Sequence, residues 1–219
     1  MTCSRSSFGV GVAVVALVAL VVTTGCGFSD GDPWGVVDLQ LTVALEPGAT
    51  NFPAVMRLSP EGPELLLNGA GERWLMLFKI YSIGLYLPER RNTAAAVLAQ
   101  KGPKRMLLVM HRHEISGGVI HDYLLSRIGD ASQAAEMEVI KERLEELDRI
   151  INGEKVIRRG GTIALDYVPD QGTVIRVNGV AKGAPIPGED FYNALLRIWL
   201  GERAKSTALR EALLGRGAG

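Results

Sequence analysis

The stretch Arg73–Leu87, "RWLMLFKIYSIGLYL", decides the fold. It is too apolar for a surface strand and too short for a membrane span, yet it carries an arginine, a lysine and two tyrosines. As one strand it would extend over about 50 Å, so we expect a bend or bulge, most simply at Gly84. Burying four such polar groups costs free energy unless each finds a partner. The segment therefore raises the question of what its polar side chains meet.

The pleat of a single strand predicts which of these side chains share a face. The first face holds Arg73, Leu75, Leu77, Lys79, Tyr81 and Ile83, and the second holds Trp74, Met76, Phe78, Ile80 and Ser82. We assign the second face to the core. The first face suits a ligand with an anionic head and an apolar body, because arginine binds a carboxylate through two parallel hydrogen bonds. The alternative is structural: Arg73 lies in a turn, Lys79 extends to water and Tyr81 bonds a backbone carbonyl.

The rest of the chain predicts an α+β fold with an antiparallel sheet. Further strands are expected at 36–45, 54–58, 64–67, 105–110, 162–168 and 173–177, with a short one after Asn178-Gly179. Helices are expected at about 93–100, 116–129, 137–151, 189–200 and 207–214. Strands come first and helices gather in the middle and at the end. The βαβ alternation of a parallel sheet is therefore missing from the pattern.

The first residues form a separate unit. After Arg5, an apolar run of fifteen residues extends from Phe8 to Val22. It is too short to cross roughly 30 Å of hydrocarbon, but it suits the core of a secretory signal peptide. The run ends in "TTGC", residues 23–26, which resembles a bacterial lipobox with threonine where leucine or valine is usual. An ordinary signal peptide cut near the same place is the alternative.

These features predict the organisation and location of the chain. Residues 1–25 are a signal peptide, 26–35 are a lipidated Cys26 with a polar tether, and 36–219 are one domain. We expect a protein anchored in the bacterial envelope by its lipid and facing the periplasm; the alternative is a soluble periplasmic protein. Cys3 and Cys26 are the only cysteines, which excludes a disulfide framework. The 24 basic and 24 acidic residues balance, so we expect no nucleic-acid partner.

Several motifs resemble the chalcone isomerase family, specifically its bacterial chalcone isomerase-like branch. They are "LNGAGERWLMLFKIYSIGLYLP", "SRIGDA", "DYVPDQGTVIRVNGVAKGAPIPGEDFYNALLRIWLGE" and "LREALLG". The resemblance covers about residues 50–215. It implies an open-faced β-sandwich, in which a large antiparallel sheet has helices packed on one face and a ligand cleft lies between sheet and helices.

The resemblance also implies a site. Plant chalcone isomerases close a flavanone ring with an arginine, which matches Arg73, and with four further polar residues. Those four positions fall on Tyr81, Ile120, Arg127 and Ile198, the last next to Trp199. An isoleucine cannot polarise an enone oxygen, although Tyr123, one turn beyond Ile120, offers a hydroxyl. Fatty-acid-binding members of the family hold a carboxylate with the arginine and a tyrosine, and this chain resembles them better.

We therefore predict a binding protein for a fatty acid or similar amphipathic carboxylate, without a cofactor or metal. The predicted ligand-binding residues are Arg73, Lys79, Tyr81, Ile120, Tyr123, Arg127, Ile198 and Trp199. One alternative is an intramolecular lyase acting on an enone, with Arg73 and Tyr81 catalytic. Another is haem binding, as is thought for some mitochondrial members of this fold, although the histidines at 111, 113 and 121 lack the spacing of a known metal site. A third is a structural protein whose cleft is filled by its own side chains.

Overall fold

The computed structural model describes residues 51–216 of the chain. The predicted signal peptide, Cys26, the tether and the strand predicted at 36–45 lie outside the described residues. Within the described part, no helix is both long enough and apolar enough to span a bilayer.

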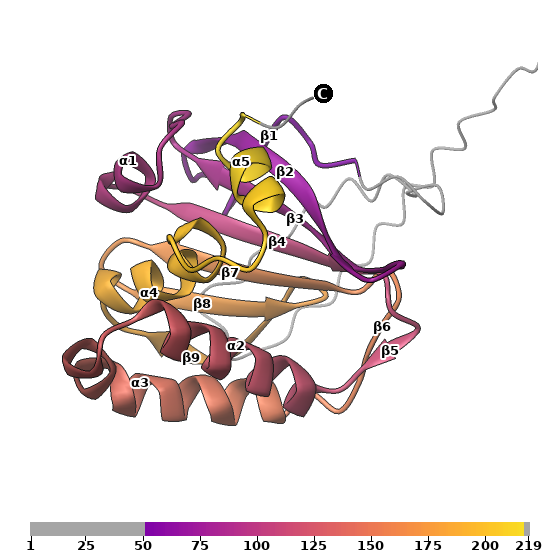
Figure 1. The fold of residues 1–219 in the computed structure, drawn as a ribbon. Helices are drawn as coiled ribbons and strands as arrows, with labels where there is room; N and C mark the ends of the chain where they lie inside the picture. The colour runs from indigo at the N-terminus through magenta and orange to yellow at the C-terminus, as the bar shows by residue number, and fades with distance from the viewer. Residues whose placement is uncertain (1–50, 217–219) are drawn as a thin grey trace, which may run out of the picture. The chain divides into compact units, whose positions relative to one another are not determined.

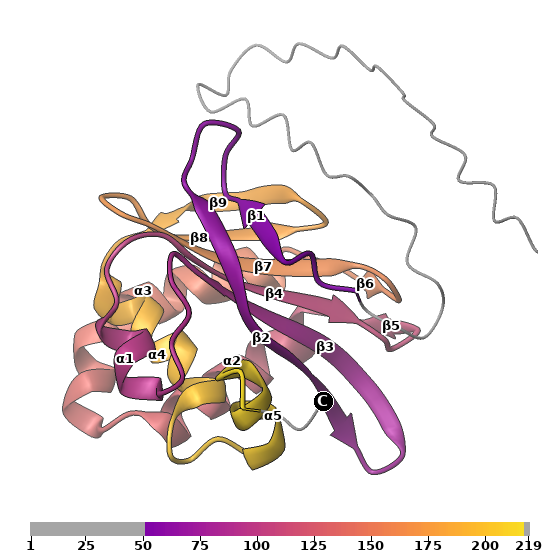
Figure 2. The same cartoon turned by 90° about the horizontal axis from the view of Figure 1, so that it is seen from above.

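A curled antiparallel sheet is the centre of the fold (Figure 1, Figure 2). Its seven strands follow the order β1-β2-β3-β4-β7-β8-β9. They are β1 (Val55–Arg57), β2 (Glu64–Leu75), β3 (Phe78–Leu87), β4 (Lys104–Met110), β7 (Thr162–Val168), β8 (Gly172–Val177) and β9 (Val180–Ile186). A separate two-stranded ribbon pairs β5 (Glu114–Ile115) with β6 (Ile157–Arg158).

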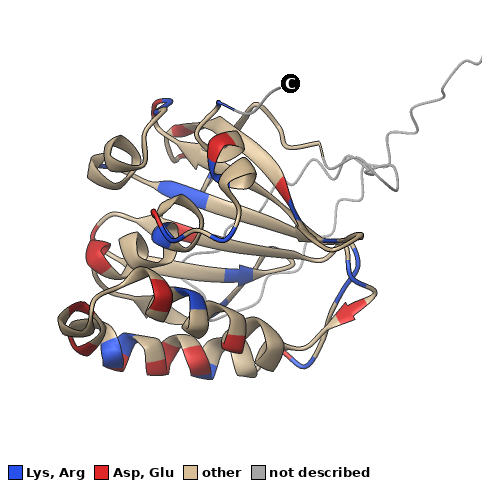
Figure 3. Ribbon diagram, viewed as in Figure 1, with Lys and Arg blue, Asp and Glu red and all other residues tan. Residues whose placement is uncertain are grey.

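Helices cover one face of this sheet, which confirms the predicted α+β class (Figure 1). They are α1 (Ala94–Ala99), α2 (Gly117–Ala131), α3 (Ala134–Asn152), α4 (Glu189–Leu200) and α5 (Thr207–Leu213). α4 is the most deeply buried, because its apolar residues, such as Phe191 and Leu195, meet the sheet on one side and neighbouring helices on the other. α3 keeps an apolar stripe inside and a charged face outside, as its spacing predicted (Figure 3).

The decisive segment is a β-hairpin and not one long strand. Leu75 of β2 pairs with Phe78 of β3, so Met76 and Leu77 form the turn between them. The prediction that Trp74, Met76 and Phe78 belong to the core is wrong, since all three are exposed. The turn interrupts the pleat on which that prediction depended.

Gly84 has a different role from the predicted bend. It lies in regular register with Ala70 on one side and Leu107 on the other. A Cβ atom at this position would lie 2.8 Å from the ring of Phe52, so glycine allows that ring to pack against the strand. The irregularities in the ladder fall instead in β2, between Leu67 and Gly69 and between Arg73 and Trp74.

The face of the sheet away from the core cluster carries a buried ionic network. Asp166 accepts hydrogen bonds from Nε and Nη2 of Arg105 at 2.5 and 2.7 Å, and from Nε of Arg176 at 3.2 Å. Asp166 is 1% exposed. Tyr86 is buried on the same strand face, and its hydroxyl has no hydrogen-bond partner within residues 51–216. The Asp166 carboxylate is thus the common partner of the Arg105 and Arg176 guanidinium groups.

Candidate functional site

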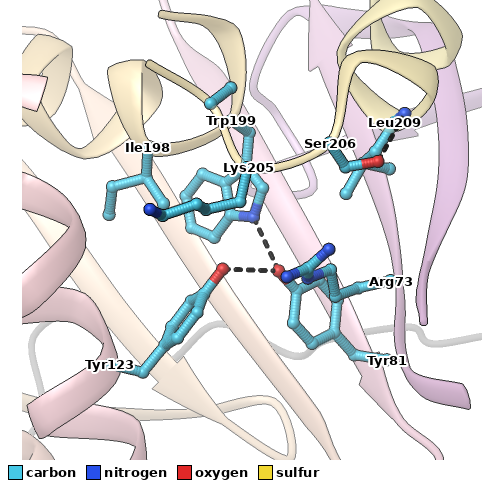
Figure 4. Close-up of a pocket in the computed structure, with 9 residues that line it drawn as sticks. Arg73, Tyr81, Tyr123, Ile198, Trp199, Lys205, Ser206 and Leu209 are labelled. Atoms are coloured by element: carbon cyan, nitrogen blue, oxygen red, sulfur yellow. Dashed lines mark hydrogen bonds between the residues drawn. The ribbon is translucent and has the colours of Figure 1, made fainter. Parts of the chain in front are cut away.

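A hydrogen-bonded group of aromatic side chains lies between the sheet and the helices (Figure 4). The Tyr81 hydroxyl, from β3, accepts a hydrogen bond from the indole N–H of Trp199 on α4 at 3.0 Å. It shares a second hydrogen bond, 3.1 Å long, with the Tyr123 hydroxyl on α2. Three elements that are distant in the sequence thus meet at one phenolic oxygen.

Arg73 joins this group from the neighbouring strand. It is the cross-strand partner of Tyr81, so the two side chains share a face of the sheet. The guanidinium lies beside the Tyr81 hydroxyl (Figure 4). Within residues 51–216 no acidic side chain forms an ion pair with Arg73, in contrast to the arginines of the buried network. A positive charge thus faces the hydroxyl cluster without a carboxylate of its own.

Burial sets the protonation state of the cluster. Desolvation raises the pKa of Tyr81 far above its usual range, and the adjacent Tyr123 raises it further, while the hydrogen bond from Trp199 and the charge of Arg73 act in the opposite direction. The phenol is therefore neutral at any physiological pH. A neutral phenol keeps its O–H as a donor, which is what an incoming carboxylate requires.

These side chains line a small pocket. Its other walls come from Ile198 on α4, from Ala204, Lys205 and Ser206 in the connection to α5, and from Leu209 on α5. The free volume is about 10 Å³, which is about the room that one water molecule needs. The pocket is polar on the side of Arg73 and the tyrosines and apolar on the side of Ile198 and Leu209.

The structure brings five of the eight predicted ligand-binding residues to this pocket: Arg73, Tyr81, Tyr123, Ile198 and Trp199. The other three lie elsewhere. Lys79 binds the Glu72 carboxylate at 2.5 Å and lies over the Trp74 ring. Ile120 is buried in the core, and Arg127 pairs with Asp130 at 2.9 Å.

Sequence reasoning missed the contribution of the connection between α4 and α5. Lys205 and Ser206 belong to a short polar segment between two helices, where nothing in the spacing indicates a site. Only the packing of α5 against β2 brings them over Arg73 and Tyr81. A hydrogen bond joins the two elements, because the side-chain amide of Asn68 in β2 donates to the Leu213 carbonyl in α5 at 2.7 Å.

The histidines lie outside this pocket. Among the residues that the structure describes, no group of three or more His, Cys, Asp or Glu side chains could hold a metal ion. His111 bonds the buried Ser82 hydroxyl at 2.7 Å, and His121 lies 2.9 Å from the Asp148 carboxylate. Both rings thus have protein partners.

Comparisons with known proteins agree with this architecture. Residues 45–215 match the family model described as chalcone isomerase-like. Among solved structures, the crystal structure of a fatty-acid binding protein from Arabidopsis thaliana is similar, with 17% identity and a TM-score of 0.55, over 74% of this chain and 90% of that chain. At this identity the similarity concerns the fold alone. No curated protein matches the sequence.

Proposed function

This chain belongs to the chalcone isomerase-like family, as its motifs predicted, and we propose that it binds a fatty acid or a similar amphipathic carboxylate without catalysing a ring closure. The carboxylate would lie between the Arg73 guanidinium and the hydroxyls of Tyr81 and Tyr123. Charge-assisted hydrogen bonds of this kind are about twice as strong as neutral ones. The solved fatty-acid binding protein of similar fold supports the choice of ligand class.

The observation that carries the proposal is the charge of the half-buried Arg73, which pairs with no carboxylate among residues 51–216. The deeply buried Arg105, by contrast, has a carboxylate partner in Asp166, as a buried guanidinium requires. Arg73 instead faces two phenols, which supply hydrogen bonds but no negative charge. A ligand carboxylate would supply that charge. Ile198, at a position where the catalytic members have a hydroxyl, gives the same pocket an apolar wall.

Binding of an acyl chain requires the pocket to open, because about 10 Å³ admits no more than a water molecule. The connection Gly201–Ser206 is the element best suited to move. It is short, and it is tied to α2 through Asp130, whose carboxylate lies 3.7 Å from Lys205 and whose carbonyl accepts from Arg203 at 3.1 Å. Exposed contacts of this kind contribute little stability, so their loss costs little.

The proposal can be tested on the full chain expressed in a bacterial host. Acids that co-purify are identified by mass spectrometry of a solvent extract, and thermal stability is measured with a long-chain acid and with its methyl ester. We expect the acid, but not the ester, to stabilise the wild type. Arg73→Gln should lose both the co-purified acid and the stabilisation. Arg90→Gln, which removes an exposed arginine elsewhere, is the control and should lose neither. An acid that stabilises wild type and Arg73→Gln equally would refute the proposal.

A second candidate, a structural role in the envelope, is favoured by the position of Trp199. Its indole fills the space between sheet and helices and bonds Tyr81, so the cleft is largely occupied by the protein itself. On this view Arg73 would bind only water. The extract described above separates the two candidates, because a structural protein would carry no acid and none would stabilise it.

We also propose that the protein is a lipoprotein of the bacterial envelope, anchored through Cys26. The support is the apolar run at residues 8–22 followed by the lipobox-like "TTGC". Metabolic labelling with a radioactive fatty acid should mark the wild type and not Cys26→Ala. Labelling of both proteins to the same extent would exclude this anchor.

A further inference from the structure

The tip of the β2–β3 hairpin is a continuous apolar surface. The hairpin tip, defined as Trp74–Phe78, reads Trp-Leu-Met-Leu-Phe, and its side chains are 48, 58, 88, 89 and 66% exposed in that order. The segment has no charged side chain, and the Trp74 indole N–H donates to the Glu72 carboxylate at 3.0 Å. Single exposed apolar residues are ordinary, but five in succession at the end of a projecting ribbon form a patch of the kind that marks an interaction site.

The turn itself favours this interpretation. A two-residue hairpin turn normally takes asparagine, aspartate or glycine, which tolerate a positive φ. Here Met76 has a φ of 53°, a conformation that is sterically unfavourable for a residue with a Cβ atom. Apolar side chains thus occupy the two positions where folding alone would favour small polar ones.

Basic side chains flank the hairpin tip. The backbone N–H of His111 donates to the Ile80 carbonyl at 2.9 Å, which holds the loop after β4 against the start of β3. That loop carries Arg112, and Arg158 in β6 is followed by Arg159, whose N–H donates to the His113 carbonyl at 3.2 Å. β5 and β6 lie at the same end of the molecule as the turn between β2 and β3 (Figure 1). Glu114 pairs with Arg158 at 3.3 Å. Within residues 51–216, Arg112 and Arg159 have no carboxylate partner.

We propose that the hairpin tip inserts into the surface of a lipid bilayer whose headgroups are anionic. Tryptophan and phenylalanine next to a lysine are typical of segments that lie at the boundary between headgroups and acyl chains. The Lys79 ammonium lies 5.4 Å from the centre of the Trp74 ring and 2.5 Å from the Glu72 carboxylate, so its charge is paired and the attraction to anionic lipid is assigned to the arginines. Arg112 and Arg159 would meet lipid phosphates, and each would add to the attraction toward an anionic surface.

A second copy of the chain fits this surface less well than a bilayer does. A two-fold interface places each patch against itself, so Arg112 and Arg159 would approach the same arginines of the other copy. A bilayer supplies anionic headgroups for the arginines. It also supplies an apolar interior that the side chains of the two-residue turn can reach. Insertion would also bring Arg73, the residue before the hairpin tip, close to the lipids. The inference concerns the surface only and does not depend on whether the pocket takes an acid.

The experiment uses the full chain with vesicles of phosphatidylcholine and phosphatidylglycerol whose acyl chains are brominated. Tryptophan emission is measured for the wild type and for Trp74→Phe, and the difference isolates Trp74 from Trp34 and Trp199. This local signal is independent of how the N-terminal segment meets the membrane. We expect the Trp74 emission to shift to the blue and to be quenched. In Met76→Glu/Leu77→Glu, compared with its own Trp74→Phe variant, the inserted fraction should fall at least about tenfold.

Val139→Glu/Val180→Glu is the matched control, since both valines are exposed on other elements. It should leave the Trp74 quenching unchanged. Three results would overturn the proposal: no quenching of Trp74 in the wild type, equal quenching in the hairpin double variant, or a blue shift without vesicles that grows with protein concentration. The last result would mean that a second copy covers the hairpin tip. Equal quenching in pure phosphatidylcholine would overturn the part assigned to the arginines.

Discussion

Tyr81→Phe tests the centre of the candidate site, because it removes one oxygen atom and leaves the shape of the core unchanged. In the wild type that oxygen accepts from the Trp199 indole and bonds the Tyr123 hydroxyl. The variant leaves the buried Trp199 N–H without an acceptor. An unsatisfied buried donor costs about 1–3 kcal/mol. For a domain of this size each kcal/mol lowers the melting temperature by about 2–4 °C.

Tyr86→Phe provides a control on the same strand. Tyr86 is as deeply buried as Tyr81 but points to the other face of the sheet, and its hydroxyl has no hydrogen-bond partner within the described residues. Burial raises the pKa of Tyr86 as it does that of Tyr81, although the charge of Arg105 lowers it in part. Removing this hydroxyl deletes a desolvated polar group and no bond, so we expect a neutral or slightly stabilising effect.

Urea denaturation of the three proteins measures the free energy of unfolding directly. We expect Tyr81→Phe to be less stable than the wild type and Tyr86→Phe to be at least as stable. Adding a long-chain acid should then stabilise the wild type more than Tyr81→Phe, because ligand affinity adds to folding stability. If the two phenylalanine variants lose the same stability, the hydroxyl cluster does not hold these three elements together, and the geometry proposed for the carboxylate fails with it.

Three further predictions concern other parts of the chain. Asp166→Ala removes the acid of the buried network and should lower the free energy of unfolding by about 3–5 kcal/mol in urea, and a loss within the ordinary range for surface changes would show that the network is not desolvated. The hydrogen bond from Arg143 holds the pKa of Asp190 below its usual range, so this stabilisation is present above the ordinary carboxyl pKa of about 3.9 and is lost as the pH falls through the lower folded-state value. The stability difference between wild type and Asp190→Asn should therefore shrink on acidification, and a constant difference would contradict the assignment. Met76→Gly should raise the free energy of unfolding by about 1 kcal/mol, because glycine accepts the positive φ of the turn; a destabilised variant in the same urea assay would show that the methionine side chain is not strained there.

The class of the fold was accessible from the sequence because hydrophobic periodicity and turn residues agree over most of the chain. The hairpin was not, because Met76 and Leu77 carry none of the usual turn chemistry and continue the apolar run without a break. The strand predicted at 64–67 stopped before the glycines of "NGAG", whereas β2 continues through them to Leu75. They lie within β2, and a Cβ atom at Gly69 would lie 2.1 Å from the Ala212 carbonyl oxygen, so they allow α5 to approach the strand.

Arg73 and Tyr81 were predicted to share a face of the sheet, and they do so, but the structural reason differs from the predicted one. Alternation along one strand put them on a common face, but they face each other across the two strands of the hairpin. Lys79 followed from the same alternation, yet the irregularity at Arg73 and Trp74 sends it to Glu72 instead. Lys205 and Ser206 could not be predicted, because their place depends on how α5 packs on β2. Local periodicity contains no information on such contacts.

The two polar clusters of the sheet differ in how the charges of their arginines are balanced. Arg105 and Arg176 are near neighbours across the sheet, and one buried carboxylate, Asp166, serves both. In that network both guanidinium charges have a carboxylate partner. On the opposite face Arg73 lies beside hydroxyls and an indole, all of which are neutral, and within residues 51–216 no carboxylate pairs with its charge. A partly buried charge tolerates such an imbalance where water or a ligand can reach it, and among residues 51–216 Arg73 lines the small pocket described above.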